Sequence, residues 1–198
     1  MHRILTPADY RRNPWKNGGG QTTEIAVHPP HAGFDDFIWR VSVADVERDG
    51  PFSTFPDTDR TLVLLQGAGM AMHGAGEPLD VSAPYEPVTF AADAALDCRL
   101  RNGPVRDFNL MVRRTRARGE LFVVRGETGT IGPAHHRLCY AASGACECLL
   151  PAHVPIALHQ GQALLAGDAH GAATMHVNPL SPDAVALVAS IRLVEDRS

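Results

Sequence analysis

The stretch from Asn13 to Glu24, NPWKNGGGQTTE, brings together residue types that could bind a small ligand. It holds the cation of Lys16, the carboxamide of Asn17, three successive glycines and the carboxylate of Glu24. Glycine loses more conformational freedom on folding than any other residue, so three in a row are typical of a place where backbone comes close to another group. Backbone N–H groups in such a loop can bind an anion. The stretch therefore predicts a binding site for a small anion such as a carboxylate.

Two predicted strands could add cationic groups to this site. Period-two alternation over residues 37–44 puts Arg40 and Ser42 on one face, and Arg60 begins a second predicted strand, 60–66, that is apolar on both faces. Arginine binds a carboxylate bidentately, whereas lysine acts as a point charge. The alternative is that Lys16 and Arg60 form weak surface salt bridges with Glu24, Asp57 or Asp59.

A later strand, 107–113, offers a carboxylate beside a carboxamide. Asp107 and Asn109 share one face, which points either into a barrel, where Asp107 could pair with an arginine or act as a base, or out to water. Alternation alone does not decide between these. The predicted ligand-binding residues are Lys16, Asn17, Gly18, Gly19, Glu24, Arg40, Ser42, Arg60, Asp107 and Asn109. If the chain is an enzyme, the predicted bases are Glu24 and Asp107.

Patterns for other chemistries are missing from the sequence. Metal-binding barrels of the cupin type use an H-x-H pair on one strand, which does not occur here, so we expect no metal and no cofactor. A G-x-S-x-G elbow is also absent, and the glycine run fits neither the P-loop nor the dinucleotide fingerprint. The cysteines at 98, 139, 146 and 148 fit no disulfide or zinc framework, and buried free thiols are favoured over a metal or redox pair, although Cys146 and Cys148 would share a strand face.

Composition narrows the class of protein. The chain has 198 residues, 44% apolar content and a net charge of −4, which are typical of a soluble globular protein that binds neither nucleic acid nor membrane. The N-terminal residues show no signal peptide, so we expect a cytoplasmic protein. One basic cluster, residues 113–118, is interpreted as a solvated connector, with a phosphate-binding patch as the alternative.

The order of predicted elements indicates an all-β chain with an internal duplication. Residues 61–67 correspond to 138–144, and 90–93 correspond to 165–168, at similar spacing in both halves. We predict two jelly-roll barrels or sandwiches, residues 1–115 with the ligand site and residues 116–198 as a degenerate copy, packed as one compact unit. A single large lipocalin-like barrel is the competing fold.

Five ordered blocks resemble the HutD/Ves family: 14–26 (PWKNGGGQTTEIA), 39–44 (WRVSVA), 50–56 (GPFSTFP), 59–62 (DRTL) and 103–111 (GPVRDFNLM). The resemblance implies a cupin-like (RmlC-like) bicupin without the cupin metal, in a cytoplasmic bacterial protein linked to histidine utilisation or stress adaptation. It further implies a binding protein without demonstrated enzymatic activity, whose ligand is a carboxylate metabolite such as urocanate or formiminoglutamate and whose role is regulation of the pathway. Asp57 departs from the family pattern, which often has glycine there.

Three functions follow as hypotheses. The first is a metal-independent binding protein for a small carboxylate. The second is a metal-independent isomerase or hydrolase with a carboxylate base. The third is a protein-interaction module, with a possible homodimer, that uses the loop containing Phe52 and Phe55.

Overall fold

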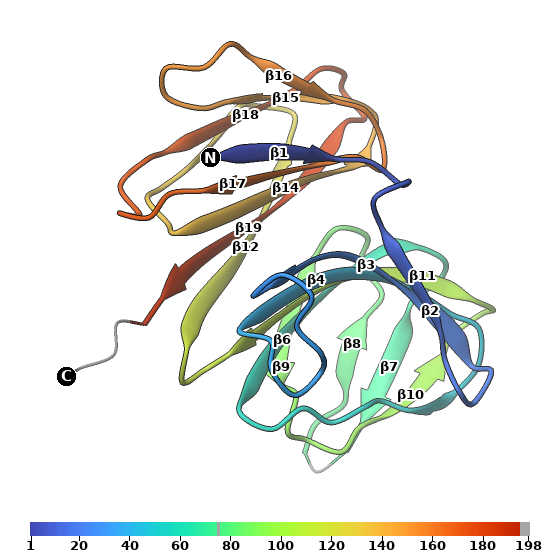
Figure 1. The fold of residues 1–198 in the computed structure, drawn as a ribbon. Coiled ribbons are helices and arrows are strands. Elements are labelled where there is room, and N and C mark those ends of the chain that lie inside the picture. Colours follow the sequence, from blue (N-terminus) through green and yellow to red (C-terminus); the bar gives the residue numbers. More distant parts are fainter. Residues whose placement is uncertain (75, 195–198) are drawn as a thin grey trace. The chain divides into compact units, whose positions relative to one another are not determined.

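The computed structural model describes residues 1–74 and 76–194, and in these ranges the chain forms strands and turns without an α-helix (Figure 1). Nothing helical in the described ranges is long and apolar enough to span a membrane. The all-β class predicted from period-two alternation is confirmed.

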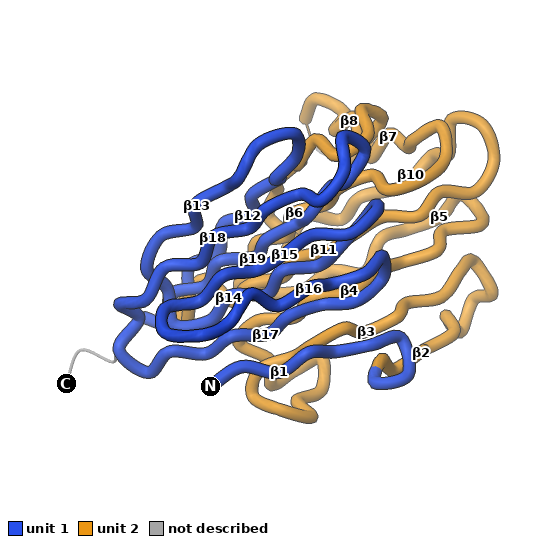
Figure 2. The backbone as a smooth tube through the Cα atoms, turned by 90° about the horizontal axis from the view of Figure 1, so that it is seen from above, with its two compact units in different colours: residues 1–9, 118–198 blue, residues 10–117 orange. Residues whose placement is uncertain are grey.

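The chain divides into two compact units, coloured separately in Figure 2. Unit 2 comprises residues 10–117, and unit 1 comprises residues 1–9 with residues 118–198. The first nine residues, assigned from the sequence to the first half, belong to unit 1 because β1 (His2–Leu5) pairs antiparallel with β17 (Ala163–Gly167). Unit 2 is therefore formed by one continuous segment, whereas unit 1 is formed by the two segments that precede and follow it.

Unit 2 contains a six-stranded and a four-stranded sheet. The larger sheet has the order β2 (Arg11–Pro14), β3 (Gly20–His28), β4 (Trp39–Val46), β11 (Val105–Arg113), β6 (Thr58–Gln66) and β9 (Pro87–Ala91). The smaller sheet has the order β5 (Gly50–Pro51), β10 (Asp97–Leu100), β7 (Met70–His73) and β8 (Leu79–Val81). The pairs β3–β4, β4–β11 and β11–β6 are antiparallel.

Unit 1 repeats this plan. Its larger sheet has the order β1, β17, β14 (His136–Ser143), β19 (Val185–Leu193) and β12 (Ala117–Arg125). Its smaller sheet has the order β13 (Gly129–Ile131), β18 (Met175–Pro179), β15 (Cys146–Leu149) and β16 (Ile156–Leu158). The order β4-β11-β6-β9 thus matches β12-β19-β14-β17, and the predicted internal duplication is confirmed.

Strand register shows which face of the larger sheet of unit 2 points into the barrel. Ser42 lies opposite Asn109, which lies opposite Leu62 on the next strand. Directly opposed residues share a face. Leu62 belongs to the apolar core together with Met70 and Met72 of the smaller sheet. The polar row that contains Ser42 and Asn109 therefore faces the barrel interior.

Alternation along β3 is interrupted by a β-bulge. The register shifts between Glu24 and Ala26, so that Glu24 lies opposite Ser42 but Val27, rather than Ala26, lies opposite Arg40. Strict alternation along residues 22–27 would put Thr22, Glu24 and Ala26 on one face, which holds for the first two residues only. A bulge inserts one unpaired residue and reverses the facing of those that follow.

Candidate functional site

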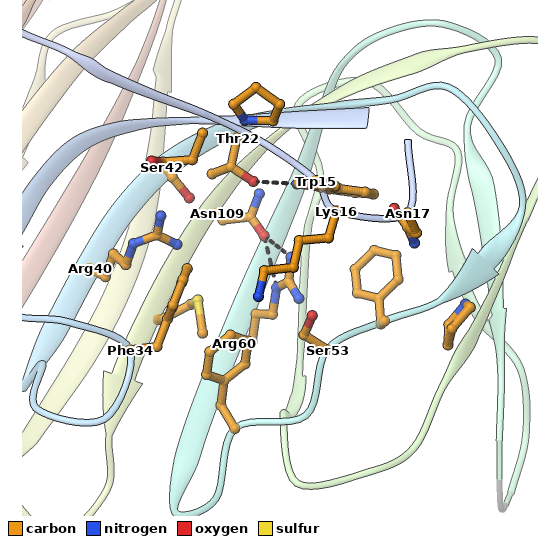
Figure 3. Close-up of a pocket in the computed structure, with 16 residues that line it drawn as sticks. Trp15, Lys16, Asn17, Thr22, Phe34, Arg40, Ser42, Ser53, Arg60 and Asn109 are labelled. Carbon is orange, nitrogen blue, oxygen red and sulfur yellow. Dashed lines mark hydrogen bonds between the residues drawn. The ribbon is translucent and has the colours of Figure 1, made fainter. Parts of the chain in front are cut away.

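A cavity of about 470 Å³ lies in unit 2, and Figure 3 shows the side chains that line it. This volume is within the range of small-molecule sites. Its lining comes from the β2–β3 hairpin, from the face of β4, β6 and β11 that points into the barrel, and from the loops around Phe34 and Phe52. The described lining residues are Asn13, Pro14, Trp15, Lys16, Asn17, Thr22, Phe34, Arg40, Ser42, Pro51, Phe52, Ser53, Phe55, Arg60, Asn109 and Met111. They include three cations and no carboxylate.

Arg40 is the most deeply buried of these cations, with 5% of its surface exposed. Its Nε donates to Oε2 of Glu24 over 2.7 Å, and its guanidinium lies 4.9 Å from the centroid of the Phe34 ring. One guanidinium nitrogen, Nη2, is buried without a hydrogen-bond partner. Leaving a buried donor unpaired costs about 1–3 kcal/mol, so this nitrogen is suited to an acceptor from a ligand.

Arg60 is held by the carboxamide of Asn109. Its Nε and Nη2 both donate to Asn109 Oδ1, the former over 2.8 Å, and its guanidinium lies 4.6 Å from the centroid of the Phe52 ring. Burial lowers the pKa of Arg60 to about 10, which leaves it a cation at neutral pH. The Phe52 ring face and the nearby Asp107 carboxylate both stabilise this cation.

Asp107 lies behind Asn109 and completes this chain of polar groups. Asn109 Nδ2 donates to Asp107 Oδ1, while Asp107 Oδ2 is buried without a partner. Burial raises the pKa of Asp107 to about 6, although the nearby Arg60 opposes the shift. Asp107 orients Asn109, and Asn109 orients Arg60.

The glycine stretch forms the turn of the β2–β3 hairpin. The Trp15 N–H donates to the Gly20 carbonyl over 2.9 Å, and the Gly19 N–H donates to Asn17 Oδ1 over 3.0 Å. Gly20 has a φ of 157°, and a Cβ there would lie 2.1 Å from the Asp45 carbonyl oxygen. The glycines therefore serve the turn and its packing, while Lys16, whose side chain extends toward Arg60, reaches the pocket (Figure 3).

Most of the predicted site residues meet in this place. Six of them line the cavity: Lys16, Asn17, Arg40, Ser42, Arg60 and Asn109. Glu24 and Asp107 do not line the cavity but accept hydrogen bonds from residues that do, Arg40 and Asn109 respectively. Gly18 and Gly19 are not among the lining residues. In the alternative interpretation Arg60 pairs with Asp57 or Asp59, but in the described residues Arg114 forms the ion pairs with these two carboxylates.

Sequence reasoning missed the aromatic wall of the pocket. Phe34 lies in the turn-rich segment after β3, and Phe52 and Phe55 lie on the loop that was considered a partner surface. Phe55 instead packs against the rings of Phe34 and Phe37, at centroid distances of 5.7 and 6.1 Å. The available signal was the presence of phenylalanines on polar loops beside strands that carry arginines.

The structure also explains Asp57, where the sequence departs from the HutD/Ves pattern that it resembles. Asp57 has a φ of 55°, in the left-handed region where glycine is favoured and aspartate is tolerated. Its Oδ2 accepts the backbone N–H of Thr115 over 3.2 Å, and its backbone N–H donates to Asp93. The loop conformation is thus one that glycine would adopt readily.

Comparison with known proteins gives consistent results. A family model described as HutD matches residues 7–181. An uncharacterized 21.2 kDa protein in the hutC 3' region of Pseudomonas putida is 39% identical over 145 residues, covering 73% of this chain and 76% of that protein. Protein Ves of Cronobacter sakazakii is 37% identical over 136 residues, covering 68% of this chain and 73% of that protein.

Solved structures agree with these matches. A conserved protein of unknown function from Pseudomonas aeruginosa PAO1 has a TM-score of 0.85 at 32% identity, covering 97% of this chain and 99% of that one. HutD from Pseudomonas fluorescens SBW25, in a formate condition, has a TM-score of 0.82 at 28% identity, covering 98% and 100%. A variant of Bacillus subtilis oxalate decarboxylase, at 8% identity with a TM-score of 0.61 over 96% of this chain and 76% of that one, shares the cupin fold alone. The chain belongs to the HutD family.

Proposed function

We propose that the chain binds a small carboxylate metabolite in the pocket of unit 2 and thereby modulates histidine utilisation. The observation that carries the proposal is Arg40 Nη2, a buried cationic donor without a partner in the wall of a cavity. Three cations and no carboxylate line that cavity, which favours an anionic occupant. The resemblance to the HutD/Ves family suggests urocanate or formiminoglutamate, both of which carry carboxylates.

The same geometry supports binding over catalysis by a carboxylate base. A general base must come within hydrogen-bond reach of the proton that it removes. Neither Glu24 nor Asp107 lines the cavity, since Glu24 is ion-paired with Arg40 and Asp107 lies behind Asn109. Both carboxylates instead position the groups that would hold the ligand.

Titration calorimetry with urocanate and formiminoglutamate tests the proposal on wild type and on Arg40→Met. Loss of a hydrogen bond to a charged group, about 1.5–3 kcal/mol, predicts that Kd rises about 10- to 150-fold. Arg101→Met is the matched control, because Arg101 pairs with Asp80 and is not part of the pocket lining. This control is expected to bind as wild type does.

Two results would contradict the proposal. If wild type binds neither acid, the ligand assignment fails. If it binds the methyl ester of urocanate as tightly as the acid, recognition does not depend on the carboxylate. Lys16→Ala is a second probe that disturbs the fold less, because Lys16 is exposed at the rim while Arg40 is ion-paired in the interior. It is expected to weaken binding less than Arg40→Met and to make it less salt-dependent.

A further inference from the structure

The interior of unit 1 contains three cysteines whose sulfur atoms lie close together. Cys139 on β14 and Cys146 and Cys148 on β15 belong to one apolar core, and each is 1% exposed or less. Their Sγ atoms all lie within 4.8 Å of one another. Because β14 and β15 belong to different sheets, the cluster joins the two layers of this barrel across its interior.

This spacing suits a single metal ion. Three sulfurs that each lie about 2.3 Å from one ion are about 3.8–4.0 Å apart, so the pairs here need to close by at most about 1 Å. Rotation of the thiol side chains can supply a movement of that size without moving the strands. The alternation along β15 that was noted in the sequence, with Cys146 and Cys148 on one face, is what aims two of the three ligands inward.

The donor set selects the kind of ion. The cluster consists of cysteines alone, without histidine or carboxylate among the described residues, and its core neighbours are aliphatic except for the thioether of Met175. Thiolate and thioether ligands favour soft ions such as Cu(I). Zn²⁺ in structural sites almost always takes four ligands, and three thiols do not supply the fourth.

A buried cation, Arg137, belongs to the same face of β14 as Cys139. Arg137 lies two residues before Cys139 on β14, so both side chains face the interior. It is 1% exposed, one of its terminal nitrogens donates to the Ala173 carbonyl, and its Nε has no hydrogen-bond partner. Buried charges are stable only when compensated, and the Asp168 carboxylate is the charge that acts on this guanidinium.

We propose that Cys139, Cys146 and Cys148 form a buried trigonal site for one Cu(I) ion. On binding, the thiols release their protons to solvent and their sulfurs ligate the metal without change of oxidation state. Because the sulfurs are buried, the ion is taken up as the chain folds. This site lies in unit 1 and is independent of the pocket in unit 2.

The test uses the full chain, unfolded with a reductant present and refolded anaerobically with Cu(I) held by a competing chelator. One copper per chain after desalting, a sulfur-to-copper charge-transfer band and three sulfur neighbours by X-ray absorption are expected. Cys148→Ala should weaken copper binding by more than about 100-fold. Loss of a group that only supports a metal ligand costs about 10- to 100-fold, so a larger loss indicates that Cys148 is itself a ligand. Cys98→Ala, which removes a buried thiol beside Met70 in unit 2, should bind as wild type does.

Several results would overturn the proposal. These are a copper content well below one per chain, nitrogen or oxygen neighbours instead of sulfur, or equal loss of copper in the Cys98 and Cys148 variants. If Cys148→Ala does not refold, the number of sulfur neighbours in wild type decides the matter alone.

Discussion

Replacing Asp107 with Asn isolates the charge of a carboxylate that is fully buried in unit 2. Burial raises the pKa of Asp107 from 3.8 to about 6, so between these values the folded chain keeps a proton that the unfolded chain has lost. Stability therefore falls as pH rises from about 4 to 6, and the full shift corresponds to about 3 kcal/mol. Asn resembles the protonated acid and can still accept the hydrogen bond from Asn109. We expect Asp107→Asn to match wild type below pH 4 and to be more stable by up to about 3 kcal/mol at pH 8.

Urea unfolding at intervals from pH 4 to pH 8 measures this difference. Asp80→Asn is the control, since it removes an exposed carboxylate paired with Arg101, and a surface pair of this kind is worth at most about 1 kcal/mol. The reasoning is refuted if the curves of Asp107→Asn and wild type run parallel over the whole range. It is also refuted if the variant is less stable at pH 8, because the carboxylate would then stabilise the fold.

Two further predictions concern the turn and the ion-pair network of unit 2. Gly20→Ala should lower the free energy of unfolding by about 1–3 kcal/mol, since its Cβ would lie 2.1 Å from the Asp45 carbonyl oxygen. Gly33→Ala, where nothing lies within 4 Å, should change it by less than about 0.5 kcal/mol in the same urea titration, and equal effects would contradict the packing argument. Arg114→Gln should raise the pKa of Asp93 toward 3.8, because the hydrogen bond from Arg114 is the largest cause that lowers it. Carboxyl-carbon NMR titration measures that pKa, and an unchanged value would refute this cause.

Local alternation was sufficient to predict the all-β class and which polar residues share a strand face, whereas the cupin-like fold was predicted from the resemblance to the HutD/Ves family. The period-two patterns correctly put Arg40 with Ser42 and Asp107 with Asn109, because these strands run without interruption through the residues concerned. Alternation did not show whether that face pointed inward, since the answer depends on which strands are neighbours in the sheet. The bulge after Glu24 and the position of Phe34 in the pocket could not be predicted from alternation either, because both depend on tertiary packing.

The duplication explains why the proposed ligand pocket belongs to one barrel. In the alignment of the two halves that the sequence suggests, Arg60 corresponds to Arg137, and the strand registers agree, with Arg60 opposite Met111 and Arg137 opposite Ser190. The residues that follow on the interior faces of the two units differ.

Unit 2 carries Asn109 and Asp107 on β11, whereas the matching positions of β19 carry Val188 and Ala186. In unit 1, where Val188 stands at the position that matches Asn109, Arg137 donates to the Ala173 carbonyl. By strand register, the positions of Leu62, Met70 and Met72 in unit 2 correspond to those of Cys139, Cys146 and Cys148 in unit 1. Since one interior arginine is common to both barrels, the residues beside it decide which chemistry each barrel can support: a carboxamide and carboxylate suit an anionic ligand, and a thiol cluster suits a soft cation.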